Sequence, residues 1–150
     1  AIVANRGYYY IPHIVKKIEG QDSLDRRFYE RHYTKVDPKH FEPIVDGMWR
    51  GVNVGGTSTA ARLEGLDVCG KTGTAENPRG RDHSTFLSFA PKDNPKIAIS
   101  VYVENGGFGA SAALPIASLL EEYYLTDTIR RPALLEHIKN MNIYYPSYDR

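Results

Sequence analysis

Four consecutive residues, Lys71, Thr72, Gly73 and Thr74, place an ammonium group and two hydroxyl groups around a position without a side chain. They follow an apolar stretch that is typical of a strand. A glycine inside a strand indicates that a ligand or another backbone comes close to it. A lysine ammonium and a threonine hydroxyl both bind carboxylates. The four residues therefore predict recognition of an anionic group beside a strand.

Side chains alternate along a strand, so Lys71 and Gly73 are expected on one face and Thr72 and Thr74 on the other. The two sets cannot face one ligand in regular geometry. At a sheet edge, however, the backbone of residues 72–76 could pair with a bound peptide as an added strand. Gly73 would then leave room for the peptide, and Lys71 would attract its carboxylate. A strand that simply ends in a bulge is the alternative interpretation.

Three strands are predicted around this stretch, over residues 66–75, 84–90 and 96–104. Residues 91–95, PKDNP, join the last two strands as a turn, because both prolines fix φ and Asp-Asn tolerates left-handed geometry. Short connections between neighbouring strands indicate an antiparallel meander. The third strand, KIAISVYVE, is apolar, and we expect its outer edge to be free to pair with another chain.

Apolar residues that recur every three or four positions predict helices over residues 41–53, 111–124 and 132–141. Ser111 is expected to cap the second of these helices. Residues 56–65 are expected to form a loop with one helical turn. An antiparallel sheet with helices packed on it places the chain in the α+β class.

The first 40 residues give weaker signals. AIVANRG is expected to be the last turn of a helix, with Asn5 and Gly7 available for the left-handed stop, and hence part of a longer chain. Residues 8–20 are expected to be extended, because they are rich in aromatic and β-branched residues. Residues 21–40 are expected to form an edge strand or a long loop.

The composition excludes several classes of function. The 150 residues are 41% hydrophobic and 25% charged, with a formal net charge of +1. Nucleic acid is not expected as a partner, because phosphate binding needs a concentrated basic surface. The single cysteine, Cys69, excludes an internal disulfide and is expected to be buried. The five histidines lack the spacing of metal ligands, so neither a metal nor a cofactor is expected.

Five stretches of the chain, in order, resemble the transpeptidase domain of class B penicillin-binding proteins of the penicillin-binding protein 2 type. They are DGMWRGVN (46–53), GGTSTAA (55–61), GKTGTAEN (70–77), TFLSFAPKDNPKIAISVYVENGG (85–107) and GASAALPIASLLEEYY (109–124). The resemblance implies that residues 1–125 are the C-terminal portion of such a domain, an incomplete part of the β-lactamase/transpeptidase-like fold. Residues 126–150 would be a C-terminal tail with a short helix.

The resemblance also implies a role for each of the four residues Lys71, Thr72, Gly73 and Thr74. Lys71 would support the hydrogen bonds around a catalytic serine and attract the substrate carboxylate. Thr72, and Thr74 with it, would bind that carboxylate, and Gly73 would allow close approach. The backbone N–H of Thr74 would be one of two donors to the oxyanion that forms during acyl transfer, a contact worth about 2.7–4 kcal/mol.

The partners implied by the resemblance are those of a D,D-transpeptidase that cross-links wall peptides. The substrate would be a peptidoglycan stem peptide ending in D-Ala-D-Ala, and β-lactams would bind in its place. The parent protein would work with cell-wall elongation proteins at the periplasmic face of the bacterial inner membrane. Its membrane anchor would lie outside these 150 residues.

The family reaction also needs a serine nucleophile in a Ser-x-x-Lys motif and a second motif, Ser-x-Asn. None of the serines in the chain is followed by lysine three positions later or by asparagine two positions later. Both motifs are expected before Ala1.

A serine β-lactamase or a β-lactam sensor domain would share the Lys-Thr-Gly strand, although the GMWRGV and SFAPKDNPKIA stretches favour the transpeptidase. A non-catalytic module that holds a peptide at its strand edge is the alternative from another class.

The 150-residue chain alone is therefore expected not to react with a fluorescent penicillin, because acylation requires the serine and its lysine together. The measurement is in-gel fluorescence after incubation, with a known penicillin-binding protein as positive control. One covalent label per chain would contradict the prediction.

Overall fold

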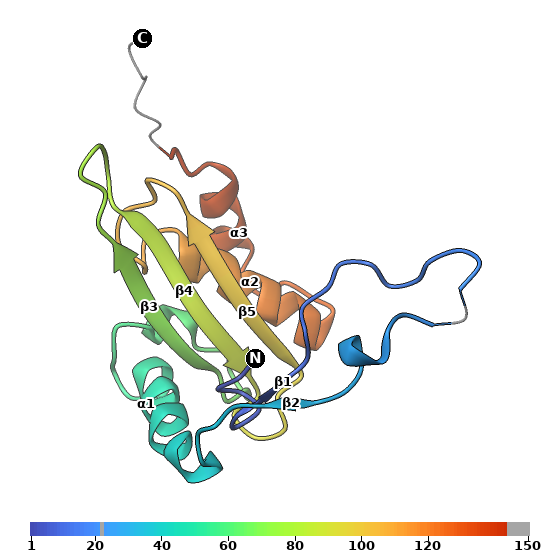
Figure 1. Cartoon of the computed structure of the whole chain (residues 1–150). Helices are drawn as coiled ribbons and strands as arrows, with labels where there is room; N and C mark the ends of the chain where they lie inside the picture. The colour runs from blue at the N-terminus through green and yellow to red at the C-terminus, as the bar shows by residue number, and fades with distance from the viewer. Residues whose placement is uncertain (22, 144–150) are drawn as a thin grey trace.

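The computed structural model describes residues 1–21 and 23–143, so the end of the predicted tail lies outside the described residues. Its centre is one antiparallel sheet with strand order β3-β4-β5 (Figure 1). The strands are β3 (Cys69–Ala75), β4 (His83–Ala90) and β5 (Ile97–Val103). The predicted meander is confirmed, with β3 beginning three residues later than expected. The α+β class is confirmed as well.

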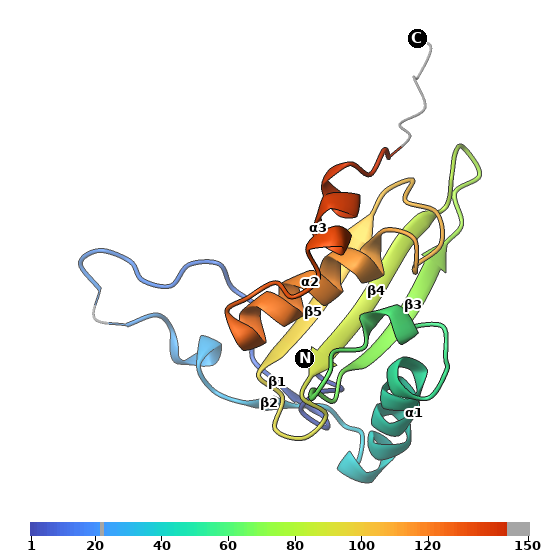
Figure 2. The same ribbon diagram turned by 180° about the vertical axis from the view of Figure 1, so that it is seen from behind.

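In the part of the chain that the structure describes, three helices pack on the sheet or on one another. Helix α1 (Glu42–Asn53) lies beside β3, α2 (Ala113–Thr126) crosses one face of the sheet, and α3 (Pro132–Lys139) packs on α2 (Figure 2). A single turn, η3 (Thr59–Ala61), lies where one helical turn is expected. Among the described residues, no helix is both long enough and apolar enough to cross a membrane.

The predicted cap of α2 is wrong. The helix begins two residues after Ser111, and no side chain of its own N-cap residue accepts a hydrogen bond. The Ser84 hydroxyl of β4 instead accepts the backbone N–H of Ala113 at 2.9 Å and donates to the Phe108 carbonyl at 2.9 Å. The sheet therefore supplies the group that satisfies the start of the helix, which local sequence does not reveal.

The N-terminal turn closes as expected at Gly7, which has a φ of 108°, but not at Asn5. Backbone N–H groups of Arg6 and Gly7 donate to the carbonyls of Val3 and Ile2, the pattern of a helix stop with a left-handed residue. Arg6, rather than Asn5, takes the first positive φ of 51°. Its guanidinium is held by the Ala4 carbonyl at 2.8 Å, and this contact accompanies the less common conformation.

The segment between this turn and α1 contains little regular structure. A two-stranded ribbon pairs β1 (Tyr8–Tyr9) with β2 (His32–Tyr33). The short turn η1 (Arg26–Phe28) lies between these strands in the chain, and a second, η2 (Pro38–His40), follows β2. The expectation of extended structure over residues 8–20 therefore holds for two strand residues only. Figure 1 shows this segment projecting as an arm away from the sheet.

The two faces of the sheet differ in what covers them. One face packs on α2, where Phe86 of β4 and Leu114 and Ala117 of α2 are completely buried. The opposite face carries Cys69 and Phe89, which pack on Val45 of α1 at one end of the sheet only. Cys69 is fully buried, as expected. In the described part of the chain the rest of that face is open, and Leu87 and Tyr102 on it are more than half exposed.

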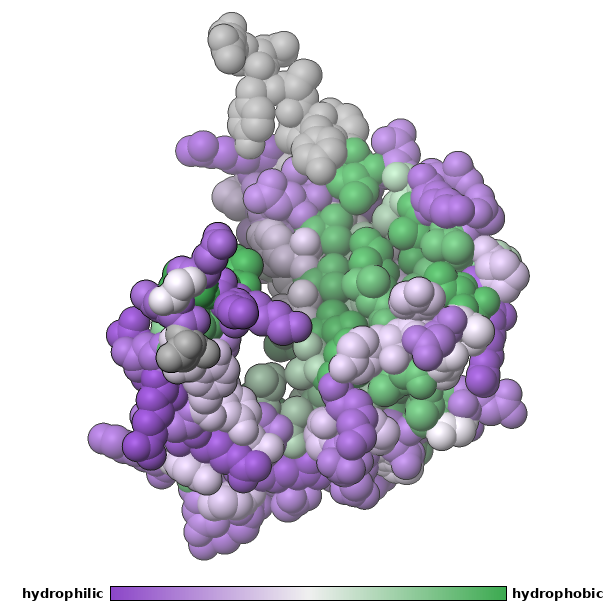
Figure 3. Space-filling model, turned by 90° about the vertical axis from the view of Figure 1, so that its right-hand side faces the viewer, coloured by the Kyte–Doolittle hydropathy of each residue, from purple (hydrophilic) through white to green (hydrophobic). Residues whose placement is uncertain are grey.

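Strand β5 forms the outer edge of the described sheet, with β4 as its only strand neighbour. Apolar side chains gather on the side of the molecule where β5 and α2 lie (Figure 3). Between α2 and α3 there is an apolar hollow of about 280 Å³, lined by Ile116, Leu119, Leu120, Tyr123, Ile129, Leu135 and Ile138. The outer edge of β5, which the sequence predicts to be free, is unpaired in the described part of the chain.

Two adjacent glutamates of α2 are buried in different environments. Glu122 pairs with the Arg131 guanidinium at 3.3 Å, and Arg131 also donates to the Ser118 hydroxyl at 2.8 Å. Glu121 is inaccessible to solvent, and among the described residues neither of its carboxyl oxygens has a hydrogen-bond partner. Burial raises the pKa of Glu121 to about 7, and the nearby Ser88 hydroxyl and Arg131 only partly oppose this shift.

The free energy of unfolding is expected to fall by about 3 kcal/mol as pH rises from about 4.5 to about 7. In that range the unfolded chain loses the Glu121 proton while the folded protein retains it, so the folded state is penalised at higher pH. Urea unfolding at a series of pH values measures this dependence. Glu121→Gln is expected to flatten it, and Glu136→Gln, at an exposed site on α3, is the control. The same pH slope in Glu121→Gln and in the unmodified protein would contradict the prediction.

Candidate functional site

Strand β3 places the four predicted site residues at an edge of the sheet. It pairs with β4 on one side only, in a register that sets Lys71 opposite Leu87 and Gly73 opposite Thr85. Directly opposed residues share a face, so Lys71 and Gly73 project to the face opposite α2. The expected alternation of side chains is therefore present, and the edge of β3 is unpaired in the described sheet.

Lys71 lies at the boundary between this edge and the uncovered face. Its side chain is exposed, and its Nζ donates to the backbone carbonyl of Thr72. Next to it is an open hollow of about 950 Å³ with a mainly apolar lining. The residues around it come from the N-terminal turn, from β1 and the chain after it, from α1, and from all three strands of the sheet, among them Ala4, Tyr10, Met48, Lys71, Leu87 and Ser100.

The two threonine hydroxyls point to the other face and have different partners. Thr72 Oγ1 lies 3.1 Å from Thr57 Oγ1, and either hydroxyl can be the donor. Thr74 Oγ1 accepts the backbone N–H of Gly109 at 3.3 Å. The structure thus brings Thr72 next to a residue that sequence reasoning did not single out. The only earlier signal for Thr57 was its place in the GGTSTAA stretch.

Gly73 is packed more closely than the sequence suggested. A Cβ on Gly73 would collide with the Thr85 hydroxyl, and a Cβ on Gly109 would lie 2.5 Å from the Gly73 carbonyl oxygen. The absent side chain therefore serves internal packing as well as any approach along the free edge. Gly73 is half-buried, with only one flank of its strand paired.

The turn that follows β3 is held in place by polar contacts. Asn77 donates to the Asn105 side chain at 2.9 Å, and its backbone N–H donates to Asp82 at 3.1 Å. His83 accepts the backbone N–H of Asn105 through Nδ1 at 3.0 Å. His83, at the start of β4, therefore helps to join the loop after β5 to the end of the site strand.

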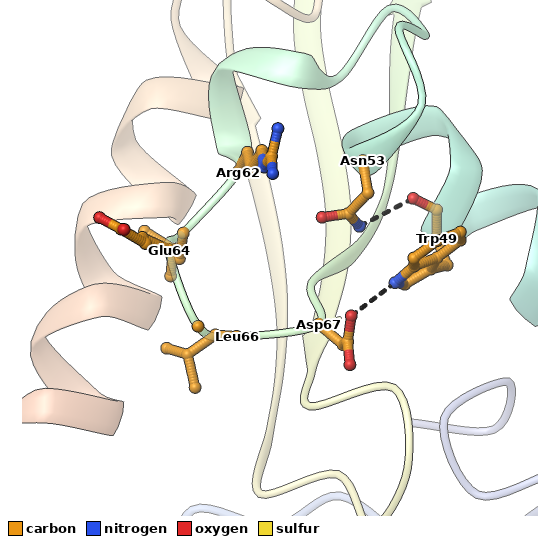
Figure 4. Close-up of a pocket in the computed structure, with 8 residues that line it drawn as sticks. Trp49, Asn53, Arg62, Glu64, Leu66 and Asp67 are labelled. Atoms are coloured by element: carbon orange, nitrogen blue, oxygen red, sulfur yellow. Dashed lines mark hydrogen bonds between the residues drawn. The ribbon is translucent and has the colours of Figure 1, made fainter.

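A second hollow, of about 740 Å³, lies between α1 and the loop before β3 (Figure 4). Trp49 Nε1 donates to Asp67 at 2.8 Å across it, and the Asn53 amide donates to the Trp49 and Val68 carbonyls at 2.9 and 3.0 Å. None of the four predicted site residues lines this hollow. Its contacts fix the end of α1 against the start of the site strand.

The sequence matches the penicillin binding protein transpeptidase domain family over residues 1–120. It is 34% identical over 150 residues to the peptidoglycan D,D-transpeptidase MrdA of Haemophilus influenzae, covering 85% of this chain and 23% of that protein. It is 30% identical to MrdA of Acinetobacter baumannii, covering 88% of this chain and 22% of that protein. The chain thus spans less than a quarter of the length of these curated relatives.

Solved structures show the same fold. A crystal structure of Pseudomonas aeruginosa PBP2 in complex with WCK 5153 matches with a TM-score of 0.68 and 35% identity, over 84% of this chain and 28% of that one. An imipenem acyl-enzyme complex of penicillin-binding protein A from M. tuberculosis matches with a TM-score of 0.66 and 28% identity, over 83% and 28% of the two chains.

Gly109→Ala is expected to lower the free energy of unfolding by about 1–3 kcal/mol, because the added methyl group meets main-chain atoms that cannot rotate away. The matched control is Gly47→Ala within α1, where a Cβ has nothing within 4 Å. There the higher helix propensity of alanine should raise the free energy of unfolding by up to about 1 kcal/mol. Urea unfolding of the two variants compares them directly. Equal stability of Gly109→Ala and the unmodified chain would contradict the packing described for Gly73.

Proposed function

Because the chain belongs to the penicillin binding protein transpeptidase domain family, we propose that it forms the carboxylate-binding side of a peptidoglycan D,D-transpeptidase. The observation that carries the proposal is a Lys-Thr-Gly-Thr strand at an unpaired sheet edge within the region that matches the family. The proposal concerns the whole protein, since the chain contains no Ser-x-x-Lys. In that protein a serine would attack the substrate carbonyl and form an acyl-enzyme.

Each of the four residues Lys71, Thr72, Gly73 and Thr74 of β3 has its own role in the proposed binding of the substrate. The peptide would lie along the free edge of β3 as an added strand, with main-chain hydrogen bonds to residues 72–76. The hydroxyls of Thr72 and Thr74, which share one face, would bind the terminal carboxylate of the substrate, and the exposed ammonium of Lys71 would help to attract it. The backbone N–H of Thr74 would donate to the oxyanion. Gly73 would leave the edge clear for close approach.

Lys71 also faces the uncovered side of the sheet, beside the apolar hollow of about 950 Å³. We propose that the part of the whole protein that carries Ser-x-x-Lys and Ser-x-Asn packs on this face. An ammonium there would support the hydrogen bonds around the serine, because Lys71 lies where the edge meets that face. The large apolar lining is consistent with a surface that is covered by protein rather than by water.

We propose a stem peptide ending in D-Ala-D-Ala as the substrate and β-lactams as ligands that take its place. Solved relatives support this assignment, since one is an imipenem acyl-enzyme complex. The whole protein would act in cell-wall elongation and cell shape, anchored in the bacterial inner membrane with this domain in the periplasm, together with other elongation proteins. The names of the MrdA relatives support the peptidoglycan reaction in this assignment.

Lys71→Ala in the whole protein is expected to lower the rate of acylation by a fluorescent penicillin by roughly 100-fold or more, because the proton transfers around the serine lose a charged group. Lys139→Ala, at an exposed site on α3, should acylate at the normal rate. Stopped-flow fluorescence separates the acylation rate from the affinity. A variant that loses affinity alone would favour a non-catalytic peptide-binding module.

We further propose that β5 mediates self-association of the chain, since its edge is apolar and unpaired in the described sheet. Sedimentation velocity over a range of concentrations is expected to show a dimer. Ala98→Lys, which places a charge on an exposed β5 position, is the variant that tests this association. Ile99→Lys is unsuitable, because the Ile99 side chain packs in the core. A chain that stays monomeric at high concentration would contradict the proposal.

A further inference from the structure

Thr57 lies outside the site strand and yet touches it through its side chain. Its Oγ1 is 3.1 Å from Thr72 Oγ1, and Thr57 itself is exposed beside the free edge of β3. Of the two hydroxyls, that of Thr72 belongs to the Lys-Thr-Gly box. The contact crosses from the loop after α1 to β3, so it depends on how closely that loop approaches the strand.

Main-chain packing sets this approach. A Cβ on Gly56 would lie 2.6 Å from the Gly51 backbone, and a Cβ on Gly51 would lie 3.4 Å from the Gly70 carbonyl oxygen of β3. The Ser58 N–H donates to the Gly51 carbonyl at 3.1 Å and closes the loop onto the helix. Asn53 then joins the end of the helix to Val68, directly before β3. The position of Thr57 next to Thr72 is thus held by the backbone.

The direction of the hydrogen bond between the hydroxyls matters for an anionic ligand. Each threonine hydroxyl has one proton, and a carboxylate can only accept hydrogen bonds. If Thr72 donated to Thr57, the Thr72 hydroxyl would present only lone pairs to the carboxylate, and the two groups could not form a hydrogen bond. If Thr57 donates to Thr72, the Thr72 proton is free to point at the ligand, and the two bonds strengthen each other.

We infer that Thr57 is a positioning residue, which donates to Thr72 so that Thr72 donates to the substrate carboxylate. This inference rests on the carboxylate-binding role proposed for β3. The other side of Thr72 is fixed as well, because its carbonyl accepts from Lys71 Nζ. The hydroxyl and the carbonyl of Thr72 therefore both have protein neighbours, and the hydroxyl proton is left for a carboxylate.

The test uses the whole protein that contains this chain and its nucleophilic serine. Thr57→Val removes the hydroxyl at constant shape, Thr57→Ser keeps it, and Thr59→Val is the control at an exposed threonine of η3. Two probes are compared, benzylpenicillin with its free carboxylate and benzylpenicillin methyl ester without one. The acylation efficiency of each variant with each probe is measured by mass spectrometry against time.

Thr57→Val is expected to lose about 10-fold in acylation efficiency with benzylpenicillin, because one hydrogen bond to a charged group is weakened. With the ester, the acylation efficiency should change less than about 2-fold. Thr57→Ser and Thr59→Val should match the unmodified protein with both probes. Equal losses on both probes would overturn the inference, because they indicate a merely structural role. Unchanged acylation of Thr57→Val by benzylpenicillin would also overturn it.

The proposed function has its own outcome in the same experiment. An unmodified protein that benzylpenicillin does not acylate would overturn the proposed function and the inference with it. An unmodified protein that is acylated, together with a Thr57→Val variant that shows no preference between the probes, would overturn the inference alone. Urea unfolding of each variant checks that Thr57→Val is folded, and Thr57→Ala, which also lacks the hydroxyl, is the second variant if it is not.

Discussion

Close contact between main chains holds the site strand where it is. Gly109 meets the backbone of Gly73 from the side of α2, and Gly51 meets the backbone of Gly70 from the side of α1. A strand held by side chains could shift as those side chains change rotamer, whereas backbone contacts leave little freedom. These contacts fix the backbone that carries the Thr72 and Thr74 hydroxyls, as the proposed recognition of a small charged group requires.

The same contacts explain why glycine recurs around this strand. At Gly73, Gly109 and Gly56 an added Cβ would lie 2.6 Å or less from atoms of neighbouring segments, whereas at Gly47 it would meet nothing. The sequence interpretation of Gly73 as a place of close approach was therefore correct in kind. The approaching group in this structure is part of the protein itself, and the outer edge of the strand is unpaired in the described sheet.

Periodicity predicted all three helices, because burial of one face leaves a regular pattern in the sequence, and apolar stretches joined by short turns predicted the three strands. The alternation of Lys71 and Thr72 could likewise be anticipated from strand geometry. What sequence could not provide were contacts between distant segments. Ser84 caps a helix that begins 29 residues later, and Thr57 meets Thr72 across 15 residues. Neither contact has a local signature, and the expectation that Ser111 would cap α2 failed for that reason.

Arg131 bears on where a functional unit of this fold must end. The match to the family stops at residue 120, in the middle of α2, yet the Arg131 guanidinium reaches back to Ser118, to Glu122 and to the Ala60 carbonyl of η3. A version cut at the family border would split a helix, and one cut between Glu122 and Arg131 would remove the counter-ion of a buried carboxylate. Any shortened version of the chain has to retain at least residues through 131 to keep that helix together with its ion pair.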